Sequence, residues 1–338
     1  MEAFNDIFED CTSLGTKIPK DNYLSEGKYI VVDQGQNIIA GYTNEEDGLY
    51  EDVPAIVFGD HTRIIKYVDE PFFLGADGVK LLKSKKKDAN YKYLYYALKN
   101  ARIPDTGYNR HFKWLKEVNI EYPEPDKQQK IVEVLDKISR VIEERKLELQ
   151  QLDELIKARF VEMFGDVILN DKNWQCKAWA DVLTIVNGRN QKDVEAENGE
   201  YLICGSGGPM SRATNYLTNE NSVIIGRKGN INKPILMREK FWNVDTAFGL
   251  EPDTMQIMVE YLYLYCVLFD FEKLNKAVTI PSLTKTDLLK IEMPIPNFAL
   301  QKKFAEFCAQ VDKSKVAVQK ALDEARLLFD SLMQEYFG

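Results

Sequence analysis

The sequence of 338 residues has few of the residue types that build metal, redox and membrane sites. It contains five cysteines and two histidines, and no two cysteines are spaced as C-x-x-C. This scarcity argues against a zinc site and favours reduced thiols in a cytoplasmic protein. The sequence also has no run of 18 apolar residues, and its acidic N-terminus lacks the apolar segment of a signal peptide. We therefore expect neither a membrane span nor secretion.

The motifs of common enzyme classes are missing as well. There is no G-x-x-x-x-G-K-[ST] phosphate loop, no H-E-x-x-H metal motif, and no N/D-P-P-Y/F or Pro-Cys element of a base-modifying methyltransferase. The glycines at 205–208 are not spaced as G-x-G-x-x-G and favour a turn beside a strand. A site of paired carboxylates stays open, because aspartate and glutamate occur throughout the chain. We expect a non-enzymatic chain that holds no cofactor and no metal of its own.

The net charge of −9 is unusual for a simple DNA-binding protein, which is commonly basic. Basic residues nevertheless cluster at 80–87, 110–116 and 227–233. Affinity for DNA depends on the local potential, so basic patches, or partner subunits that add positive charge, are sufficient for binding. The net charge therefore does not exclude DNA binding.

What the sequence does contain is a duplication. A strand-like run, a Pro-x-Pro element, a Gln-Lys pair and a long helix ending in Phe-Gly occur twice in this order, about 172 residues apart. The elements are Pro123-Glu124-Pro125, Gln129-Lys130 and Phe164-Gly165 in the first copy, and Pro294-Ile295-Pro296, Gln301-Lys302 and Phe337-Gly338 in the second. A repeat of this size predicts two similar globular domains, each followed by a long helix.

The segment before each Pro-x-Pro element predicts an α+β domain, because short β-like runs precede a helix in both. We predict strands at 29–32, 55–58, 62–65, 201–203, 222–225 and 234–237, and helices at 90–101 and 259–271. The predicted division is domain one at 1–122, helix one at 123–165, domain two at 166–295 and helix two at 296–338.

Both long helices carry the apolar repeat of a coiled coil. In the first, ten positions from 131 to 163 step alternately by four and three, and all but Arg145 and Arg159 are apolar. We expect these arginines to fix the register, with snorkelling or pairing across the seam as alternatives. The second helix has a wider stripe from Phe304 to Leu332. If the helices pair, they must run antiparallel, so the expected fold is two similar α+β domains joined by two antiparallel coiled-coil helices, with a pseudo-two-fold repeat.

Polar and basic side chains occupy matching loops of both domains. Arginine and lysine suit guanine O6/N7 or phosphate, and asparagine and glutamine suit adenine N6/N7. Each side chain alone is more commonly a solvated loop residue, but their recurrence in matching loops favours DNA contact. The predicted DNA-binding residues are Gln34, Gln36, Asn37, His61, Arg63, Asn109, Arg110, His111, Lys113, Arg189, Asn190, Gln191, Ser206, Arg212, Arg227, Lys228, Asn230, Asn232, Ser282 and Lys285.

With these residues assembled, the chain resembles the specificity subunits of type I restriction–modification systems. The resemblance rests on the duplicated elements above, on the segments 109–116, 160–166 and 280–283, and on Gly226-Arg227-Lys228-Gly229, which is similar to the family's I-G-R-x-G turn. Domain one departs from the family at this turn, where it has Gly59-Asp60-His61. A role transferred to Arg227 is therefore not carried over to domain one.

The resemblance implies two target-recognition domains that read a bipartite, asymmetric sequence in double-stranded DNA. It also implies helices that set the spacer and bind two methyltransferase (modification) subunits, which hold S-adenosylmethionine. Restriction subunits using ATP and Mg²⁺ are a further possible partner. Two alternatives stay open: the specificity subunit of a type II-like combined nuclease and methyltransferase, and a coiled-coil scaffold whose domains bind protein.

Overall fold

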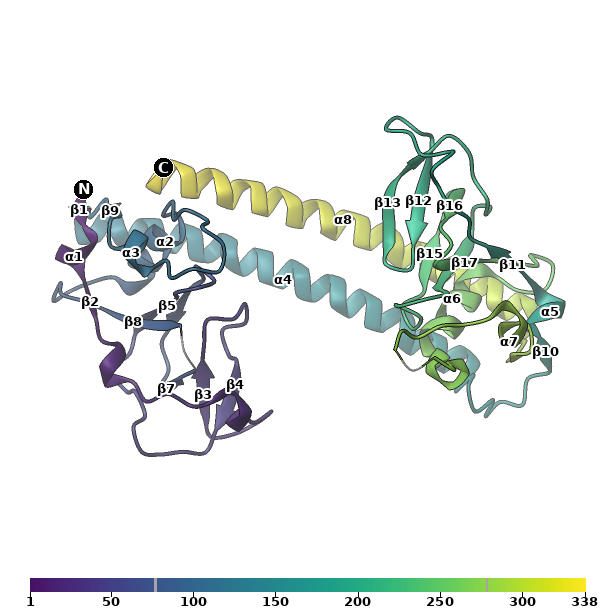
Figure 1. Cartoon of the computed structure of the whole chain (residues 1–338), viewed down its shortest axis with the longest axis horizontal. Coiled ribbons are helices and arrows are strands. Elements are labelled where there is room, and N and C mark those ends of the chain that lie inside the picture. Colours follow the sequence, from purple (N-terminus) through teal and green to yellow (C-terminus); the bar gives the residue numbers. More distant parts are fainter. Residues whose placement is uncertain (76–77, 278) are drawn as a thin grey trace. The chain divides into compact units, whose positions relative to one another are not determined.

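The computed structural model describes residues 1–75, 78–277 and 279–338. The chain divides into two compact units. Unit 1 comprises Met1–Arg145 and Ala321–Gly338, and unit 2 comprises Lys146–Lys320. Both long helices, α4 (Pro125–Phe164) and α8 (Phe298–Phe337), therefore contribute residues to each unit (Figure 1).

Unit 1 contains two small sheets. A four-stranded antiparallel sheet has the order β2-β8-β5-β6, and a three-stranded sheet has the order β4-β3-β7, in which β3 and β7 are parallel. A separate antiparallel pair, β1-β9, joins the N-terminus to the strand before α4. The elements are β1 (Glu2–Ala3), α1 (Phe4–Ile7), β2 (Phe8–Asp10), β3 (Tyr29–Val32), β4 (Gly41–Thr43), β5 (Ala55–Gly59), β6 (Ile65–Val68), β7 (Phe72–Leu74), β8 (Val79–Ser84), α2 (Tyr91–Lys99), α3 (Phe112–Leu115) and β9 (Asn119–Ile120), with 3₁₀ turns at Thr12–Leu14 and Lys20–Asn22.

Unit 2 repeats this topology. Its four-stranded sheet has the order β11-β17-β14-β15, its three-stranded sheet has the order β13-β12-β16, and β10 pairs with β18. The parallel pair of unit 1 recurs as β12 and β16. The elements are β10 (Cys176–Ala178), α5 (Trp179–Val182), β11 (Leu183–Asn187), β12 (Tyr201–Gly205), β13 (Gly208–Ala213), β14 (Ser222–Gly226), β15 (Ile235–Met237), β16 (Phe241–Asn243), β17 (Ala247–Pro252), α6 (Val259–Leu268), a 3₁₀ turn (Phe271–Leu274), α7 (Lys285–Leu288) and β18 (Glu292–Pro294). The predicted α+β duplication is confirmed.

One predicted strand is wrong. The run 62–65 is expected to be extended, but β6 begins only at Ile65. The Arg63 amide donates to the Gly59 carbonyl (2.7 Å), and Arg63 has φ of 63°. This left-handed conformation belongs to a turn, so the β-branched residues of the run do not determine its structure. The helix predicted at 259–271 likewise ends at Leu268, before a short 3₁₀ turn.

The long helices use their predicted apolar seams in part. The predicted Ile131, Leu135, Ile156 and Phe304 are buried. At the end of α4 the buried residues are Phe160 and Phe164 rather than the predicted positions 159 and 163, because a seven-residue repeat drifts around a straight helix. In unit 2, α4 and α8 meet through Phe160, Phe164 and Phe304, whose ring centroids are 5.0–5.4 Å apart. In unit 1, residues of the opposite ends of the two helices, including Leu135 and Met333, share one apolar cluster. The helices are therefore antiparallel. Arg159 pairs with Glu162 of its own helix (2.7 Å) and lies 5.8 Å from the ring of Phe307.

The repeat register differs by one residue from that predicted for the glutamines. Gln128 and Gln301, which are 173 residues apart, are both buried, and their side-chain amides donate to the carbonyls of Pro123 (2.7 Å) and Pro296 (2.9 Å). The predicted counterpart, Gln129, is exposed. Burial and the bond to the preceding proline show that Gln128 is the true equivalent of Gln301.

No helix within residues 1–75, 78–277 and 279–338 is long and apolar enough to cross a membrane.

Candidate nucleic-acid interface

Three loops of unit 1 meet beyond the ends of β3 and β5. The main-chain amide of His61 donates to Gln34 Oε1 (3.3 Å), and Thr62 Oγ1 donates to the Gln34 carbonyl (2.6 Å). The Nδ1 atom of His61 lies 3.2 Å from the carbonyl oxygen of Asn109, in the loop before α3. The structure therefore brings the predicted residues Gln34, His61 and Asn109 together.

An exposed aromatic residue, Tyr108, belongs to the same group of loops. Its side chain is 86% exposed and stacks on the imidazole of His61, with ring centroids 4.7 Å apart and planes inclined by 8°. Tyr108 is absent from the residues predicted from sequence, which are histidines and polar or basic side chains. The sequence does contain a signal that Tyr108 is exposed. It is an aromatic residue between Gly107 and Asn109, in a loop of mostly polar residues.

His111 corrects the predicted interface. The side chain is completely buried. Its Nδ1 lies 3.0 Å from the carbonyl oxygen of Asp60, and its Nε2 lies 3.2 Å from Thr106 Oγ1. A buried ring held at both nitrogens cannot contact DNA, so His111 fastens the turn after β5 to the loop before α3.

The other predicted residues near α3 lie on the surface. Arg63 pairs with Asp105 across these loops (2.7 Å). Arg110 and Lys113 are exposed, and Lys113 Nζ lies 4.7 Å from the Trp114 ring centroid. Positive charge is therefore available beside the group formed by the three loops.

A buried lysine shapes the loop between β3 and β4. Lys66 Nζ donates to the carbonyl oxygen of Asn37 and lies 3.7 Å from Asp33 Oδ1. Burial lowers the pKa of Lys66, and the negative charge of Asp33 opposes this effect. The predicted residues Gln36 and Asn37 are exposed on the loop that Lys66 holds.

The turn after β14 is the corresponding feature of unit 2. Lys228 forms an isolated β-bridge with Ser282 in the loop before α7. The main-chain amide of Leu283 donates to the carbonyl of Arg227 (2.9 Å). The structure thus brings the predicted residues Arg227, Lys228 and Ser282 together.

The turn between β12 and β13 adds Ser206 to this group, beside Asn230 of the turn after β14. A Cβ atom at Gly229 would lie 3.9 Å from Ser206 Oγ, and a Cβ atom at Gly207 would lie 3.8 Å from Asn230 Nδ2. Gly229 has φ of 80°, a left-handed conformation that glycine adopts without strain. Ser206 and Asn230 therefore lie in the same loop group as Arg227.

Two predicted residues of unit 2 fasten the fold. Asn232 Oδ1 accepts the main-chain amide of Phe271 (2.8 Å), and Lys285 Nζ donates to the carbonyl of Ile185 (2.6 Å). Each side chain thus makes a hydrogen bond within the fold, although Asn232 is exposed and the Lys285 ammonium has two further donors. Both side chains therefore help to hold local structure, and their contact with DNA stays a prediction.

The other predicted residues of unit 2 lie on separate segments. Arg212, on β13, donates to the carbonyl of Gly199 (3.2 Å). Arg189 and Asn190 are exposed and Gln191 is half-buried in the loop that follows β11.

The turns after β5 and β14 share main-chain connections but differ in charge. His111 donates its amide to the Asp60 carbonyl (2.8 Å), as Leu283 does to Arg227. The buried Asp60 side chain accepts the amide of Phe112 (2.7 Å). Asp60 and His61 thus stand where unit 2 has Arg227 and Lys228, and a charge-based role of these two residues is not shared by unit 1.

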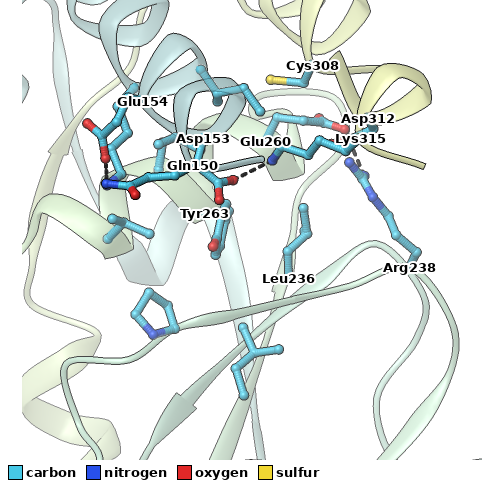
Figure 2. Close-up of a pocket in the computed structure, with 16 residues that line it drawn as sticks. Gln150, Asp153, Glu154, Leu236, Arg238, Glu260, Tyr263, Cys308, Asp312 and Lys315 are labelled. Atoms are coloured by element: carbon cyan, nitrogen blue, oxygen red, sulfur yellow. Dashed lines mark hydrogen bonds and ion pairs between the residues drawn. The ribbon is translucent and has the colours of Figure 1, made fainter. Parts of the chain in front are cut away.

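A cavity of about 640 Å³ lies elsewhere in unit 2, among α4, α6, α8 and β15 (Figure 2). Lys315 Nζ pairs with Asp153 Oδ1 (2.5 Å) between the long helices, and Arg238 pairs with Glu260 (2.8 Å). The residues that line this cavity are different from the predicted DNA-contact residues. Its ion pairs and apolar floor belong to the packing of the domain against the helices.

Comparison with known proteins gives a family match over most of the chain. Residues 3–153 and 171–325 match the type I restriction modification DNA specificity domain, in two copies. The chain is 25% identical over 259 residues to the type I restriction enzyme MjaIX specificity subunit of Methanocaldococcus jannaschii, which covers 65% of this chain and 60% of the relative. It is 31% identical over 132 residues to the EcoR124I/EcoR124II specificity subunit of Escherichia coli, covering 35% and 33%. The matches thus span less than two thirds of either curated relative.

The fold is similar to that of a type I restriction–modification S subunit from M. genitalium, with a TM-score of 0.67 at 18% identity over 100% of this chain and 95% of the other. These findings confirm the resemblance predicted from the duplicated motifs. Because both copies of the family domain are matched, the chain belongs to the type I restriction modification DNA specificity family.

Proposed function

We propose that the chain is the DNA-recognition subunit of a type I restriction–modification system, and that each unit reads one half of a bipartite target. The observation that carries this proposal is that both units present the same loop arrangement with different side chains. Repeated loops predict the same mode of binding. Different side chains, such as His61 and Lys228, predict different half-sequences and hence an asymmetric target.

The chemistry is carried out by partners. Two methyltransferase subunits that hold S-adenosylmethionine transfer the methyl group, and this chain directs them to the target without catalysis or a cofactor of its own. Duplicated helix–domain junctions, marked by Gln128 and Gln301, support two equivalent docking surfaces for identical partners. Restriction subunits, which use ATP and Mg²⁺, join this assembly where the system includes them. We place the complex in the cytoplasm.

The two alternatives are less well supported. The family match does not favour the type II-like assembly. A protein-binding scaffold predicts no salt-dependent affinity for DNA, whereas a DNA reader loses affinity steeply as salt rises. Titrating a target duplex with the partner-bound chain at several salt concentrations separates these functions.

The length of the long helices provides the structural test of the proposal. Each is one uninterrupted helix of 40 residues that belongs to both units. Deleting seven residues from the middle of both shortens each by about 10 Å, equivalent to roughly 3 bp of duplex. Methylation mapping should then find both half-sequences unchanged and the spacer shorter by a similar amount. An unchanged spacer would contradict the role of the helices in spacing.

A further inference from the structure

We propose that Tyr108 in unit 1 and Ile280 in unit 2 are specificity-determining residues, each making the apolar contact with a base of its own half-site. This inference rests on the proposed DNA recognition and adds side chains that the hydrogen-bonding pattern does not select. Tyr108 is 86% exposed and Ile280 is 58% exposed. A water-exposed apolar side chain at a loop tip gains free energy when a ligand covers it.

The two residues occupy equivalent positions in the repeat. His111 and Leu283 make the same main-chain bond to the turns after β5 and β14. Tyr108 and Ile280 each lie three residues before that bond. Both units therefore place an exposed apolar side chain in the loop that contacts the predicted DNA-reading turn.

In both loops, described residues beside the exposed side chain have hydrogen-bonded main-chain amides. In unit 1, Asp105 Oδ1 accepts the amide of Gly107 (3.0 Å), and the Tyr108 ring stacks on His61. In unit 2, Asn275 Oδ1 accepts the amides of Ala277 (3.0 Å) and Ser282 (3.1 Å). Residues whose main chain is already bonded lose little conformational entropy on binding, so a side chain beside them is suited to selective contact.

Duplex DNA is the ligand that this surface fits. Arg110 and Lys113 are exposed close to Tyr108 in the sequence, and Arg227 and Lys228 lie on the turn that contacts the loop of Ile280. Cations that hold phosphates place the apolar tip against the bases rather than against a protein surface. The tip then contacts a thymine 5-methyl group in the major groove or enters a base step, and both are apolar base contacts.

The experiment is selection of preferred sites from a randomised duplex library by the full chain bound to its methyltransferase partner. Tyr108→Ala should reduce discrimination by roughly ten- to a hundredfold at one position of one half-site. Ile280→Ala should do the same only in the other half. Tyr108→Phe should retain the preference, because the ring makes the contact. Leu14→Ala, which removes an exposed apolar residue of unit 1 outside these loops, is the matched control.

Replacing the preferred thymine by deoxyuridine separates the two apolar modes. Loss of preference identifies contact with the methyl group, whereas retained preference with increased 2-aminopurine fluorescence identifies entry into the base step. The inference is overturned if Tyr108→Ala leaves the preference unchanged, weakens all sequences equally, or is matched by Tyr108→Phe. A wild-type complex without any bipartite preference would instead contradict the proposed function.

Discussion

The turn after β5 in unit 1 and the turn after β14 in unit 2 can be compared residue by residue. Both are tied to the loop before a short helix by a main-chain bond of 2.8–2.9 Å. Unit 1 then places a buried aspartate and an aromatic stack there, whereas unit 2 places an arginine and a lysine. The main chain therefore positions the reading surface, while the side chains at fixed positions set its chemistry.

The helix seams differ in a similar way. Phe160 in unit 2 is surrounded by the rings of Phe164, Tyr261 and Phe304 at 5.0–5.5 Å. Met333, 173 residues later, occupies the equivalent position in the seam of unit 1. At this one position unit 2 therefore has a rigid ring among other rings, and unit 1 has a flexible side chain, although Phe337 still packs on Tyr93 nearby (5.3 Å).

The largest expected effect concerns this junction. Phe160→Ala should lower the stability of unit 2 by about 4 kcal/mol, because it opens a cavity among rigid rings, and Met333→Ala should cost unit 1 about 3 kcal/mol. Hydrogen exchange resolved by unit is the suitable measurement, because two units need not unfold together. A smaller loss of stability for Phe160→Ala than for Met333→Ala would contradict the proposed difference between the seams of the two units.

The second effect concerns charge at the turns. Replacing both Arg227 and Lys228 by alanine should weaken target binding about a hundredfold and reduce the salt dependence by about one ion for each phosphate that is no longer neutralised. His61→Ala should leave the salt dependence unchanged. The turn of unit 1 has Asp60 and His61 in place of the arginine and lysine of unit 2, so this substitution removes no arginine or lysine that could hold a phosphate. Equilibrium binding at several salt concentrations measures both quantities. Equal salt dependence for the two variants would contradict the difference between the turns.

A third effect concerns the buried glutamines. Gln301 accepts the amide of Met258 and donates to two carbonyls, whereas Gln128 donates to Pro123. Gln301→Ala should cost about 2 kcal/mol and Gln128→Ala about 1 kcal/mol, because buried partners lose their bonds. Chemical denaturation should show almost no effect for the exposed control Gln129→Ala. A larger loss of stability for Gln129→Ala than for Gln128→Ala would support the register predicted from sequence, in which Gln129 is the equivalent of Gln301.

The smallest effect concerns thiol reactivity. Burial raises the pKa of Cys204 and of Cys308 to about 12, whereas Cys176 is exposed. A thiol with a raised pKa stays neutral and unreactive below that pH, so alkylation between pH 7 and 9 should modify Cys176 first. Peptide mapping of the native chain checks this order. Early modification of Cys204 would indicate that unit 2 opens locally.

The fold is predictable where the determinants are local. The duplicated order of elements follows from motifs near Phe164 and Phe337, and the seam of α4 follows from periodicity as far as Ile156, so these features are found from sequence. The turn at Arg63 is not, because β-branched neighbours favour a strand while the main-chain bond to Gly59 requires a left-handed residue. The glutamine register is ambiguous in the sequence because Gln128 and Gln129 are adjacent.

The candidate site is predictable as a set of loops but not residue by residue. Whether a polar side chain faces solvent depends on contacts distant in the sequence. His111 is buried against Asp60, and Lys285 bonds to a strand 100 residues earlier, and neither contact leaves a local pattern. The exposure of Tyr108 depends in the same way on which segments leave it uncovered.

Base-resolution mapping of methylated sites decides whether the two units read separate half-sequences. It compares cells that carry the wild-type chain and its methyltransferase partner with cells that carry Arg227→Ala or Asn230→Ala. The wild type should give two asymmetric half-sequences around a fixed spacer, and both variants should relax or impair the same single half. A change in both halves, or one continuous recognition sequence, would contradict separate reading by the two units.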